Sequence, residues 1–579
     1  MITRLRRLTS HAWNHQWAIV GLLAATAFAL GVAGLYEFKA TNGKLEEWSW
    51  EDAVYFSLRL FGFNYDLSIG DSPPYTASNW QLRIARFLAP ASTILALVKA
   101  VAVSAASRLS LWWISHWKGH AVVCGAGERG KHLALSLRRE GRRVVVVEQQ
   151  KDSDTLSRLR TEGVYVVHGN VTDPAVLDAA RVRTAGIVVA LTPSVEANLE
   201  VVLAASDRSR GLPVRAFAYA PRAFATMFEG RKPFARDRAD QERVQPQPNE
   251  SVTEYAFFDH HAIAARVLLC EHAPRIATGV FRERRGARIL VAGDGDVLPE
   301  LLGATVVQCQ FAGPHLPRVA LMTVDNDAIA GGFPLHHPQM PLVANLDVRR
   351  IRLSRMLSLD LGTFSTGHDP EPFDLVLVAC RQDSDTLALA MALAQQKTMA
   401  PRVVAGLAPS TRLESTFDRT FGTSQPLAGV EIVNLLSLGC EVRHIVRQEL
   451  DETARAIHEA YLRKQREAGT PMGKTMALHH WEDLRGDFRQ SSRSQADHQA
   501  VKQRILAESS SAETIELLAE AEHRRWMADR IVSGWLYAAQ RDDAQRLHDC
   551  IRPYAELCEK DRNKDREAVR DAANQASPS

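Results

Sequence analysis

Residues 120–148 read HAVVCGAGERGKHLALSLRREGRRVVVVE, and this stretch decides the fold of the region around it. A short apolar run, 121–124, leads into a glycine-rich turn and a segment with helical spacing. A second apolar run then closes at Glu148. Short apolar runs on either side of a helical pattern are typical of a strand, helix, strand unit in a parallel sheet. We therefore predict an α/β, Rossmann-like domain that begins near residue 118.

Three glycines in the turn, Gly125, Gly127 and Gly130, have the spacing of a dinucleotide-binding turn. The first permits a tight turn, the second lets the backbone approach a pyrophosphate, and the third lets the helix pack closely on the strand. The following helix N-terminus offers N–H groups to the phosphates. We expect a nucleotide site formed by Gly125, Ala126, Gly127, Glu128, Arg129 and Gly130. A nucleotide-free scaffold of the same fold is the alternative.

Glu148 lies about 20 residues beyond Gly127, where an acid can accept hydrogen bonds from ribose hydroxyls. A carboxylate there favours NAD(H) or an adenine nucleotide such as ATP or ADP over a ligand with a 2′-phosphate. Arg142 and Arg143 lie nearby and argue in the opposite direction. Glu148 is therefore the residue we expect to decide the ligand.

Composition excludes some classes of protein. The length of 579 residues suggests about three or four domains. The net charge of +3 is small for this length and argues against a nucleic-acid partner. Seven cysteines stand far apart without a CxxC pair, which predicts reduced thiols and argues against a metal site. No catalytic set of residues is apparent, so we do not expect an enzyme.

Two segments are long and apolar enough to cross a bilayer, Trp17–Tyr36 and Phe87–Ala106. The second contains Lys99, which either extends toward the headgroups or faces an aqueous path. Basic residues flank the pair on both sides and acidic residues fill the loop between them. By the positive-inside rule, both termini lie in the cytoplasm of a multi-pass protein of the cell (inner) membrane. We expect a cytoplasmic tail over residues 1–15 and a transmembrane hairpin over 16–110.

Between these segments, residues 48–66 read WSWEDAVYFSLRLFGFNYD. At Asp52 and at residues 55–57 this stretch resembles the pore helix of two-helix potassium channels. The alternating glycines of the channel filter are missing, and potassium selectivity depends on the carbonyl rings that they form. The residues that stand in their place, our pore-loop candidates, are Phe61, Gly62, Phe63, Asn64, Tyr65 and Asp66. Two helices cannot enclose a pore alone, so a channel requires an oligomer. A non-conducting anchor is the alternative.

Beyond Glu148, residues 162–205 read EGVYVVHGNVTDPAVLDAARVRTAGIVVALTPSVEANLEVVLAA. Together with the glycine turn they resemble the RCK, or TrkA-N, regulatory domain of potassium channels and transporters, here expected over 118–245. The resemblance implies potassium transport and further nucleotide contacts at the loops after the third and fourth strands. The matching positions are Gly169, Asn170, Val171, Thr172 and Asp173, then Leu191, Thr192 and Pro193. Asn170 replaces the family's usual Asp, and Asp173 either caps a helix or contacts the ligand.

A second, degenerate copy follows at 287–302, ARILVAGDGDVLPELL, and at 372–394, PFDLVLVACRQDSDTLALAMALA. Leu298 replaces the third glycine, and Asp294 and Asp296 would repel phosphate. We expect a second Rossmann-like RCK domain over 286–445 that serves structural pairing or binds a different ligand. A helical connector is expected over 246–285. His260 and His261 within it suit an interface or surface better than a metal.

The charged, helical region 451–570 resembles the RyR domain, the helical repeat named from ryanodine receptors. His458-Glu459 echoes Glu522-His523, and residues 481–484 echo 554–557, which suggests an internal duplication. Aromatic faces with nearby cations would suit a nucleotide or phosphorylated ligand. The candidates are Trp526, Trp535, Tyr537 and Tyr554, with Arg493, Arg525, Lys560 and Arg562; a plain helical core is the alternative. Residues 571–579 are expected to be a disordered tail.

The predicted architecture is thus multidomain, with a two-helix transmembrane hairpin, tandem α/β Rossmann-like RCK domains and an all-α RyR domain. This architecture resembles a nucleotide-regulated, RCK-gated cation channel in the lipid bilayer, assembled as a homotetramer, in which the RyR domain senses a second ligand. A non-conducting membrane-anchored nucleotide sensor or scaffold is the first alternative. An NAD-consuming enzyme is the second.

Overall fold

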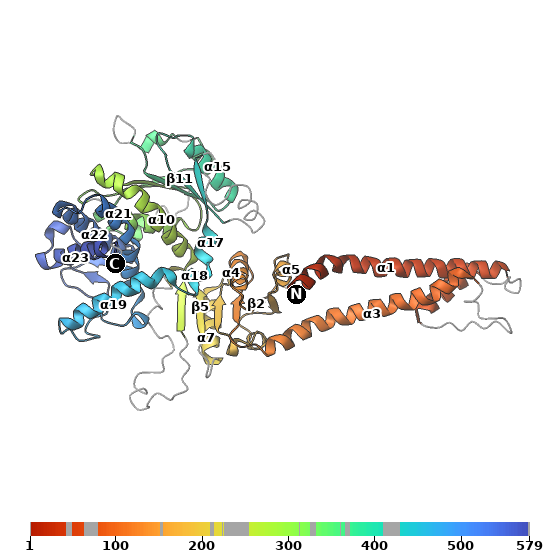
Figure 1. The fold of residues 1–579 in the computed structure, drawn as a ribbon. Coiled ribbons are helices and arrows are strands. Elements are labelled where there is room, and N and C mark those ends of the chain that lie inside the picture. The colour runs from red at the N-terminus through yellow and green to blue at the C-terminus, as the bar shows by residue number, and fades with distance from the viewer. Residues whose placement is uncertain are drawn as a thin grey trace, which may run out of the picture. The chain divides into compact units, whose positions relative to one another are not determined.

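The computed structural model describes residues 2–41, 49–62, 79–150, 154–208, 214–222, 224, 254–311, 313–324, 332–358, 360–364, 371–408 and 429–576. The chain forms two compact units (Figure 1). The first unit comprises residues 1–118 and 148–181, and the second comprises 119–147 and 182–579.

The first unit contains a helical hairpin. Its elements are α1 (Ile2–Thr41), α2 (Trp50–Arg59), the 3-10 turn η2 (Leu60–Gly62) and α3 (Trp80–Ser115). Two stretches, Ile19–Phe38 and Trp80–Ala100, are long and apolar enough to cross a membrane. The backbone is helical from Ile2, so most of the expected N-terminal tail is part of α1.

The two long helices approach closely where side chains are small. A Cβ built on Gly34 would lie 2.7 Å from Leu82 Cγ, so the glycine is what permits this distance. Asn79 reinforces the contact, because its Nδ2 donates to the Gly34 carbonyl over 2.8 Å. Elsewhere the hairpin is exposed: only 28% of each apolar stretch is buried within the chain. Such an apolar surface suits lipid or neighbouring subunits rather than water.

The short helix α2 packs against both long helices. Ser57 is buried against α1, where a Cβ on Gly31 would lie 2.9 Å from its Oγ. Leu60, at the start of η2, is fully buried beside α3. At the N-terminus, the Ser49 N–H donates to Asp52 Oδ2 over 2.8 Å, which satisfies one free amide of the first turn. Helix α2 covers Asp52 and residues 55–57, and its role as a pore helix stays a prediction.

The first sheet has the strand order β3-β2-β1-β4-β5-β6, and the pairs from β2 through β6 are parallel. Its strands are β1 (Ala121–Cys124), β2 (Val144–Glu148), β3 (Tyr165–His168), β4 (Ile187–Ala190), β5 (Arg215–Tyr219) and β6 (Glu254–Phe258). The helices are α4 (Glu128–Arg139), α5 (Asp154–Thr161), α6 (Pro174–Ala179) and α7 (Val195–Arg208). The order reverses between β1 and β4, where open α/β sheets bind ligands. Strand β6 lies in the range expected to be connector.

The second sheet, entirely in the second unit, has the order β12-β11-β10-β7-β8-β9 with all pairs parallel. Its strands are β7 (Arg288–Gly293), β8 (Arg318–Thr323), β9 (Asn345–Arg350), β10 (Leu375–Ala379), β11 (Val403–Leu407) and β12 (Val430–Asn434). Its main helices are α11 (Leu298–Gln308) and α15 (Asp383–Ala394). From β9 to β12 the order repeats that of the first sheet, which confirms the predicted second Rossmann-like domain.

A long helix, α10 (His260–Arg282), connects the two sheets along the chain. Asp259 caps it, because its Oδ1 accepts from the His261 N–H over 2.9 Å. Two short helices after the second sheet, α17 (Leu435–Cys440) and α18 (Val442–Ile445), return toward the first lobe and contact α4. A Cβ on Gly439 would lie 2.2 Å from the His260 carbonyl oxygen, so α17 meets α10 at a glycine.

The C-terminal helical module, residues 451–576, consists mainly of helices. Its helices are α19 (Glu452–Glu467), α20 (Gly486–Asp497), α21 (Gln499–Glu508), α22 (Ala512–Val532) and α23 (Glu559–Ala576), with 3-10 turns η8 (Trp481–Asp483) and η9 (Tyr554–Glu556). Two strands of two residues each, β13 (Leu536–Tyr537) and β14 (Leu547–His548), pair in parallel between α22 and α23. Because α23 continues to Ala576, the expectation of disorder from residue 571 is wrong for 571–576.

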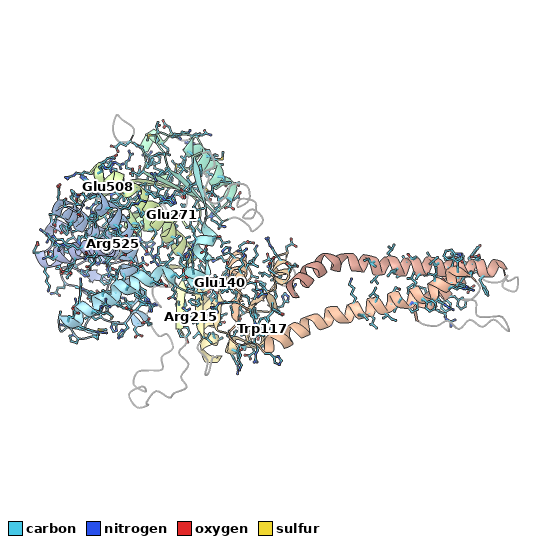
Figure 2. All side chains as sticks on the ribbon, in the orientation of Figure 1. Trp117, Glu140, Arg215, Glu271, Glu508 and Arg525 are labelled. Carbon is cyan, nitrogen blue, oxygen red and sulfur yellow. The ribbon has the colours of Figure 1, made fainter. Side chains whose placement is uncertain are left out.

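This helical module and the second sheet share one hydrophobic core. Val291 of β7, Leu302 of α11, Trp481 of η8 and Trp535 belong to the same buried cluster. On the surface, Arg282 of α10 pairs with Glu508 of α21 over 2.9 Å; Glu508 is labelled in Figure 2. The module is therefore built onto the second lobe rather than tethered to it.

The helical module repeats one arrangement of side chains, as the sequence predicts. In the first half His458 Nε2 lies 2.8 Å from the carbonyl oxygen of His479. In the second half His523 Nε2 lies 2.9 Å from the carbonyl oxygen of Arg552. Each carbonyl stands two residues before a 3-10 turn, η8 or η9. The register therefore aligns His458 with His523.

An arginine completes each copy. Arg489 Nη2 donates to the Glu482 carbonyl over 2.7 Å, and Arg562 Nη2 donates to the Ala555 carbonyl over 2.6 Å. The two guanidinium groups lie over the first aromatic ring of η8 and of η9, respectively. The same donor, acceptor and ring recur in each half, which confirms the internal duplication.

Candidate functional site

The glycine turn after β1 has the geometry that the spacing predicts. Gly125 has a φ of +101°, which L side chains rarely adopt, and its N–H donates to the Val147 carbonyl over 2.9 Å. A Cβ built on Gly130 would lie 1.9 Å from the Gly125 carbonyl oxygen. Only glycine permits this approach of α4 to the turn. The first and third glycines thus shape the turn.

Gly127 has a different role. It is the N-cap of α4, with a φ of −58°, and no described atom lies within 4 Å of a Cβ built on it. The absence of a side chain is therefore not required by packing. The free amides of the first turn of α4 begin at this position, where a helix N-terminus attracts phosphate. Because packing does not require a glycine here, we interpret Gly127 as the position where a missing side chain leaves room for a ligand. That ligand could then contact the backbone at the N-terminus of α4.

Arg129 projects from the first turn of α4. Its guanidinium carbon lies 4.6 Å from the centre of the Tyr219 ring, at the end of β5. Its Nη1 is buried and has no hydrogen-bond partner among the described residues. Burial, together with the charge of Asp259, raises the pKa of the Tyr219 hydroxyl, so this hydroxyl stays protonated. The Arg129 guanidinium, which has one N–H group without a partner among the described residues, is therefore a candidate to pair with an anionic ligand.

The loop after β4 contains Thr192 and leads to a buried residue that sequence reasoning missed, Asn198. Asn198 is fully buried, and its Oδ1 accepts from the Thr192 N–H over 2.9 Å. Its Nδ2 donates to the carbonyls of Thr192 and Tyr219, each over 3.0 Å. Asn198 therefore fixes the ends of β4 and β5 together. The helix also contains Glu196 and Glu200, so an asparagine in it is only a weak signal in the sequence.

Glu148 and the loop after β3 belong to the first unit. Glu148 Oε1 accepts from the N–H groups of Gln149 and Gln150 over 2.9 and 3.1 Å. The Gly169 N–H donates to the Glu148 carbonyl over 3.0 Å, which places this glycine beside the acid. Gly169 has a φ of +153°, and a Cβ there would lie 2.3 Å from Val176. The carboxylate and the loop thus lie together at the end of β2.

Four further candidates, residues 170–173, follow Gly169. Asn170 Oδ1 accepts from the Thr172 N–H over 3.1 Å, so the side chain that replaces the family's Asp shapes its own loop. Val171 is buried. Asp173 is the N-cap of α6, with Oδ1 accepting from the Ala175 N–H over 2.8 Å. Of the two predicted roles of Asp173, helix cap and ligand contact, the structure shows the helix cap.

His260 is an interior residue. It is 7% exposed and its ring lies 5.1 Å from that of Tyr219, so it belongs to the junction between β5 and α10. Burial lowers the pKa of His260, so the ring is neutral at physiological pH. His261 lies beside it, with ring centres 3.9 Å apart. Both fit the interface role predicted for them.

The corresponding turn after β7 is closed. A Cβ on Gly293 would lie 2.0 Å from the Ala379 carbonyl oxygen, and the Gly295 N–H donates to that same oxygen over 3.0 Å. Asp294 Oδ1 accepts from the Arg381 N–H over 3.0 Å. The Asp294 carboxylate therefore accepts a hydrogen bond from a backbone N–H at the switch point of this sheet. Polar groups at this turn are thus hydrogen-bonded within the chain, as expected for a degenerate copy.

A cavity of about 140 Å³ lies between β6, α10, α11 and α20. Its charged side chains pair with one another. Arg266 donates to Asp451 over 2.7 Å and to Asp497 over 2.6 Å, and Arg493 donates to Asp451 over 2.7 Å. Burial alone would raise the pKa of Asp451, but Arg493 and Arg266 hold it well below its usual range. This network joins the helical module to α10.

The ligand candidates of the helical module separate by burial. Trp535 has no exposed surface, and its indole N–H donates to Asp487 Oδ2 over 3.0 Å. Arg525 is buried in an ion pair with Glu522, 3.0 Å apart (Figure 2). The expectation that these two offer a ligand-binding face is therefore corrected: both are core residues. Tyr554 is 8% exposed, whereas Tyr537 is 46% exposed and Trp526 is half-buried.

In the hairpin, the pore-loop candidates Phe61 and Gly62 lie in η2, directly after α2. The candidates Phe63, Asn64, Tyr65 and Asp66 lie outside the described residues. Lys99 is buried within the chain at 6% exposure. Trp117, labelled in Figure 2, follows α3. Its ring packs edge to face on that of Tyr165, with ring centres 4.8 Å apart.

Two family models match parts of this chain. Residues 121–229 match the TrkA-N domain, and residues 501–575 match the RyR domain. The first match covers the glycine turn and the loops after β3 and β4. The second covers α22, β13, β14 and α23. The chain therefore carries a TrkA-N domain and a RyR domain, as the sequence motifs predict.

Among curated proteins, no sequence matches this chain. Solved structures include two that are similar over much of its length. The GsuK channel is 16% identical, with a TM-score of 0.37, over 74% of this chain and 99% of that one. The GsuK channel bound to NAD is 15% identical, with a TM-score of 0.35, over 76% of this chain and 86% of that one. The fold described above rests on the strands and helices of this chain itself.

Proposed function

We propose that this chain is a membrane protein in which nucleotide binding to the TrkA-N domain regulates a transmembrane hairpin. The observation that carries the proposal is the open position at Gly127, at the N-terminus of α4 and at the switch point of the first sheet. The ligand is NAD(H) or an adenine nucleotide, with its phosphates at the turn 125–130. Arg129 supplies a cation for those phosphates, and Glu148 accepts hydrogen bonds from the ribose.

A path from this site to the membrane helices follows from the chain itself. Residues 116–120 are all that separate α3 from β1. Within the first unit, α1 contacts α5 and α3 contacts α6. The loop 169–173 ends at the N-cap of α6, so a ligand that holds this loop also holds a helix beside α3. A ligand shifts such an equilibrium only by its different affinity for the two states.

The hairpin supports the cation-channel form of this proposal. The helix α2 lies between two apolar helices, and apolar side chains on it face outward: Trp50, Tyr55 and Leu58 are more than half exposed. These side chains suit contact with lipid or other subunits. A homotetramer would bring four such hairpins around one axis and eight Rossmann lobes beneath it. Both termini would then lie in the cytoplasm.

The second candidate is a non-conducting nucleotide sensor or scaffold in the membrane. The sequence of residues 61–65, FGFNY, favours it because the alternating glycines of a potassium filter are missing. An NAD-consuming enzyme is the third possibility, and turnover of NAD by the purified protein would promote it.

Ion flux from liposomes tests the proposal. The purified protein should release cations at a rate that changes when NAD(H) or ATP is added. Gly127→Asp should abolish that change, because a negative side chain at the turn repels the phosphates. Flux no greater than that of empty liposomes under any nucleotide would contradict the channel and leave the sensor. Nucleotide-dependent flux that survives Gly127→Asp would contradict the assigned site.

A further inference from the structure

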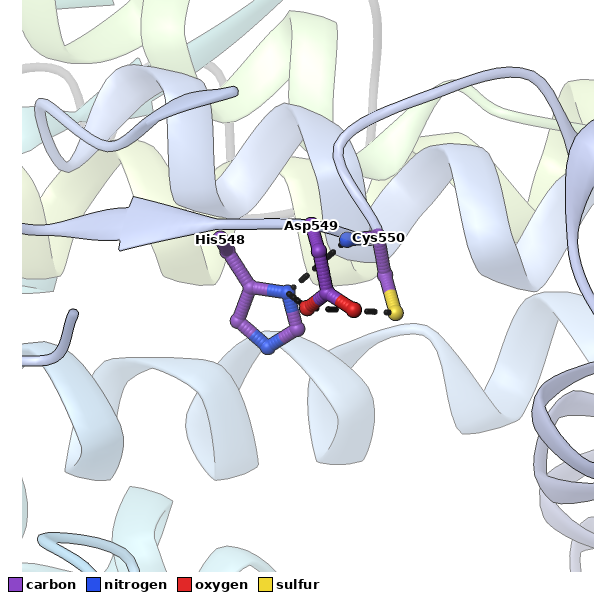
Figure 3. A group of neighbouring side chains, drawn as sticks. All are labelled: His548, Asp549 and Cys550. Atoms are coloured by element: carbon purple, nitrogen blue, oxygen red, sulfur yellow. Dashed lines mark hydrogen bonds and ion pairs between the residues drawn. The ribbon is translucent and has the colours of Figure 1, made fainter. Parts of the chain in front are cut away.

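Metal-ligating side chains gather where the loop after β14 meets α23. His548 is the last residue of β14, and Asp549 and Cys550 follow it (Figure 3). Asp561, in the first turn of α23, faces the same thiol. The sequence gives no CxxC pair here, which is why a metal site was not expected.

The distances between the ligand atoms suit one small cation. His548 Nδ1 lies 3.3 Å from Asp549 Oδ1, and Asp549 Oδ1 lies 4.0 Å from Cys550 Sγ. The three ligand atoms all lie within 4.8 Å of one another. Asp561 Oδ2 lies 3.9 Å from Cys550 Sγ. Ligands about 2.0–2.3 Å from a tetrahedral zinc ion stand roughly 3.3–3.8 Å apart, close to these values.

We propose that His548, Asp549 and Cys550, with Asp561 as a fourth ligand, bind one divalent cation of the zinc type. One imidazole, one thiolate and two carboxylates are ligands that zinc accepts, and the thiolate disfavours magnesium and calcium. The proposal is independent of the nucleotide site, because all four residues belong to the RyR domain.

Two contacts bear on how the ion would enter. His548 Nδ1 accepts from the Cys550 N–H over 3.0 Å, and binding would exchange this single hydrogen bond for a bond to the metal. Asp561 Oδ1 accepts from Lys564 over 2.7 Å, which leaves Oδ2 directed at the thiols of Cys550 and Cys558. The ion would join the loop after β14 to α23 and thereby stabilise the end of the helical module.

Cobalt binding tests the proposal on the full-length protein in detergent with a reducing agent. After removal of metals with a chelator, titration with Co²⁺ should produce the absorption of a thiolate-bound ion at one equivalent per chain. Zinc should displace the cobalt and raise the unfolding temperature. Cys550→Ser should remove the thiolate absorption. Asp549→Asn, at a side chain 45% exposed, should leave the fold intact and weaken binding by roughly tenfold or more.

Two control variants match these changes. Cys270→Ser, in α10, and Asp571→Asn, on the exposed face of α23, should leave cobalt binding unchanged. Absence of the thiolate absorption in the wild type would overturn the proposal. So would absorption that persists unchanged in Cys550→Ser, or affinity that is the same in Asp549→Asn as in the wild type.

Discussion

The turn after β1 and the turn after β7 occupy the same place in two sheets of the same strand order, but the first is open and the second is filled. At the first turn Gly127 faces free space, and Arg129 retains an unused donor. At the second, the Ala379 carbonyl meets Gly295 and a carboxylate from Asp294 holds an amide of the opposite loop. The two lobes thus share one topology and differ at this turn, and the nucleotide binding that we propose is assigned to the open one.

The helix after the fourth strand shows how far the two lobes still agree. In the first lobe the Thr192 N–H donates to Asn198, and in the second the Cys380 N–H donates to Thr386 Oγ1 over 2.8 Å. The spacing between donor and acceptor is the same in both. The support beneath the switch point is therefore common to both lobes, and the difference is confined to the turn.

The largest effect should come from replacing Gly130, the third glycine of the first turn, by leucine, the residue that stands at the corresponding position 298 of the second turn. Gly130→Leu should destabilise the protein by about 3–5 kcal/mol or prevent folding, because its Cβ alone would lie 1.9 Å from the Gly125 carbonyl. Urea unfolding measures the change. Gly127→Ala is the matched control and should leave stability nearly unchanged, since its Cβ meets open space. Equal stability of Gly130→Leu and wild type would show that the close approach is not required.

The helical module should respond to acid through His498, which is fully buried at the C-terminal end of α20. Burial, with the charge of Lys502, lowers the pKa of His498 to about 3. The unfolded chain takes up this proton near pH 6.5, so the stabilising contribution is complete above that pH and is lost as the pH falls toward 3. The loss should reach a few kcal/mol by pH 4. Unfolding of His498→Gln between pH 7 and 4 should show a shallower decline; an identical slope would contradict the assignment.

Removing the side chain that accepts a backbone N–H after the fourth strand, Asn198 in the first lobe or Thr386 in the second, should lower the free energy of unfolding by different amounts. Asn198→Ala loses the acceptor of the Thr192 N–H and two donors, and should cost about 2–3 kcal/mol. Thr386→Val loses the bond from the Cys380 N–H over 2.8 Å and the longer bonds that Oγ1 donates to the Gln382 and Cys380 carbonyls, over 3.2 and 3.5 Å, and should cost about 1 kcal/mol. Denaturant unfolding of both variants gives the comparison. Equal costs would mean that the additional bonds of Asn198 do not contribute.

A smaller effect is expected at the ribose end of the first site. Glu148→Gln keeps the side-chain shape and removes the charge, so NAD or ATP affinity should fall roughly tenfold. Calorimetry measures it. Glu140→Gln, at the exposed end of α4, is the control and should bind as the wild type does. Unchanged affinity in Glu148→Gln would leave ligand choice to other residues.

Much of this arrangement could be predicted from the sequence, because it follows from local patterns. Apolar runs gave both sheets, glycine spacing gave the open turn, and Leu298 with Asp294 indicated the degenerate one. The repeated motifs of the helical module also predicted its duplication. Long-range packing could not be predicted in the same way. Whether Trp535 offers a face to a ligand or fills a core depends on Asp487 and on helices far along the chain.

The metal-ligating group shows the same limit. Asp561 joins His548, Asp549 and Cys550 only because α23 folds back beside β14. The chain has no CxxC pair, and the spacing of these four residues along it does not follow a zinc pattern. Asn198 was missed for a related reason, since its partners lie at the ends of two separate strands.

The central claim is that the first turn binds a nucleotide and the second does not. Calorimetric titration of the full-length protein with NAD and with ATP tests it most directly. The account predicts one nucleotide per chain, loss of binding in Gly127→Asp, and unchanged binding in Asp294→Ala. Two nucleotides per chain, binding that survives Gly127→Asp, or binding that is lost in Asp294→Ala would contradict it.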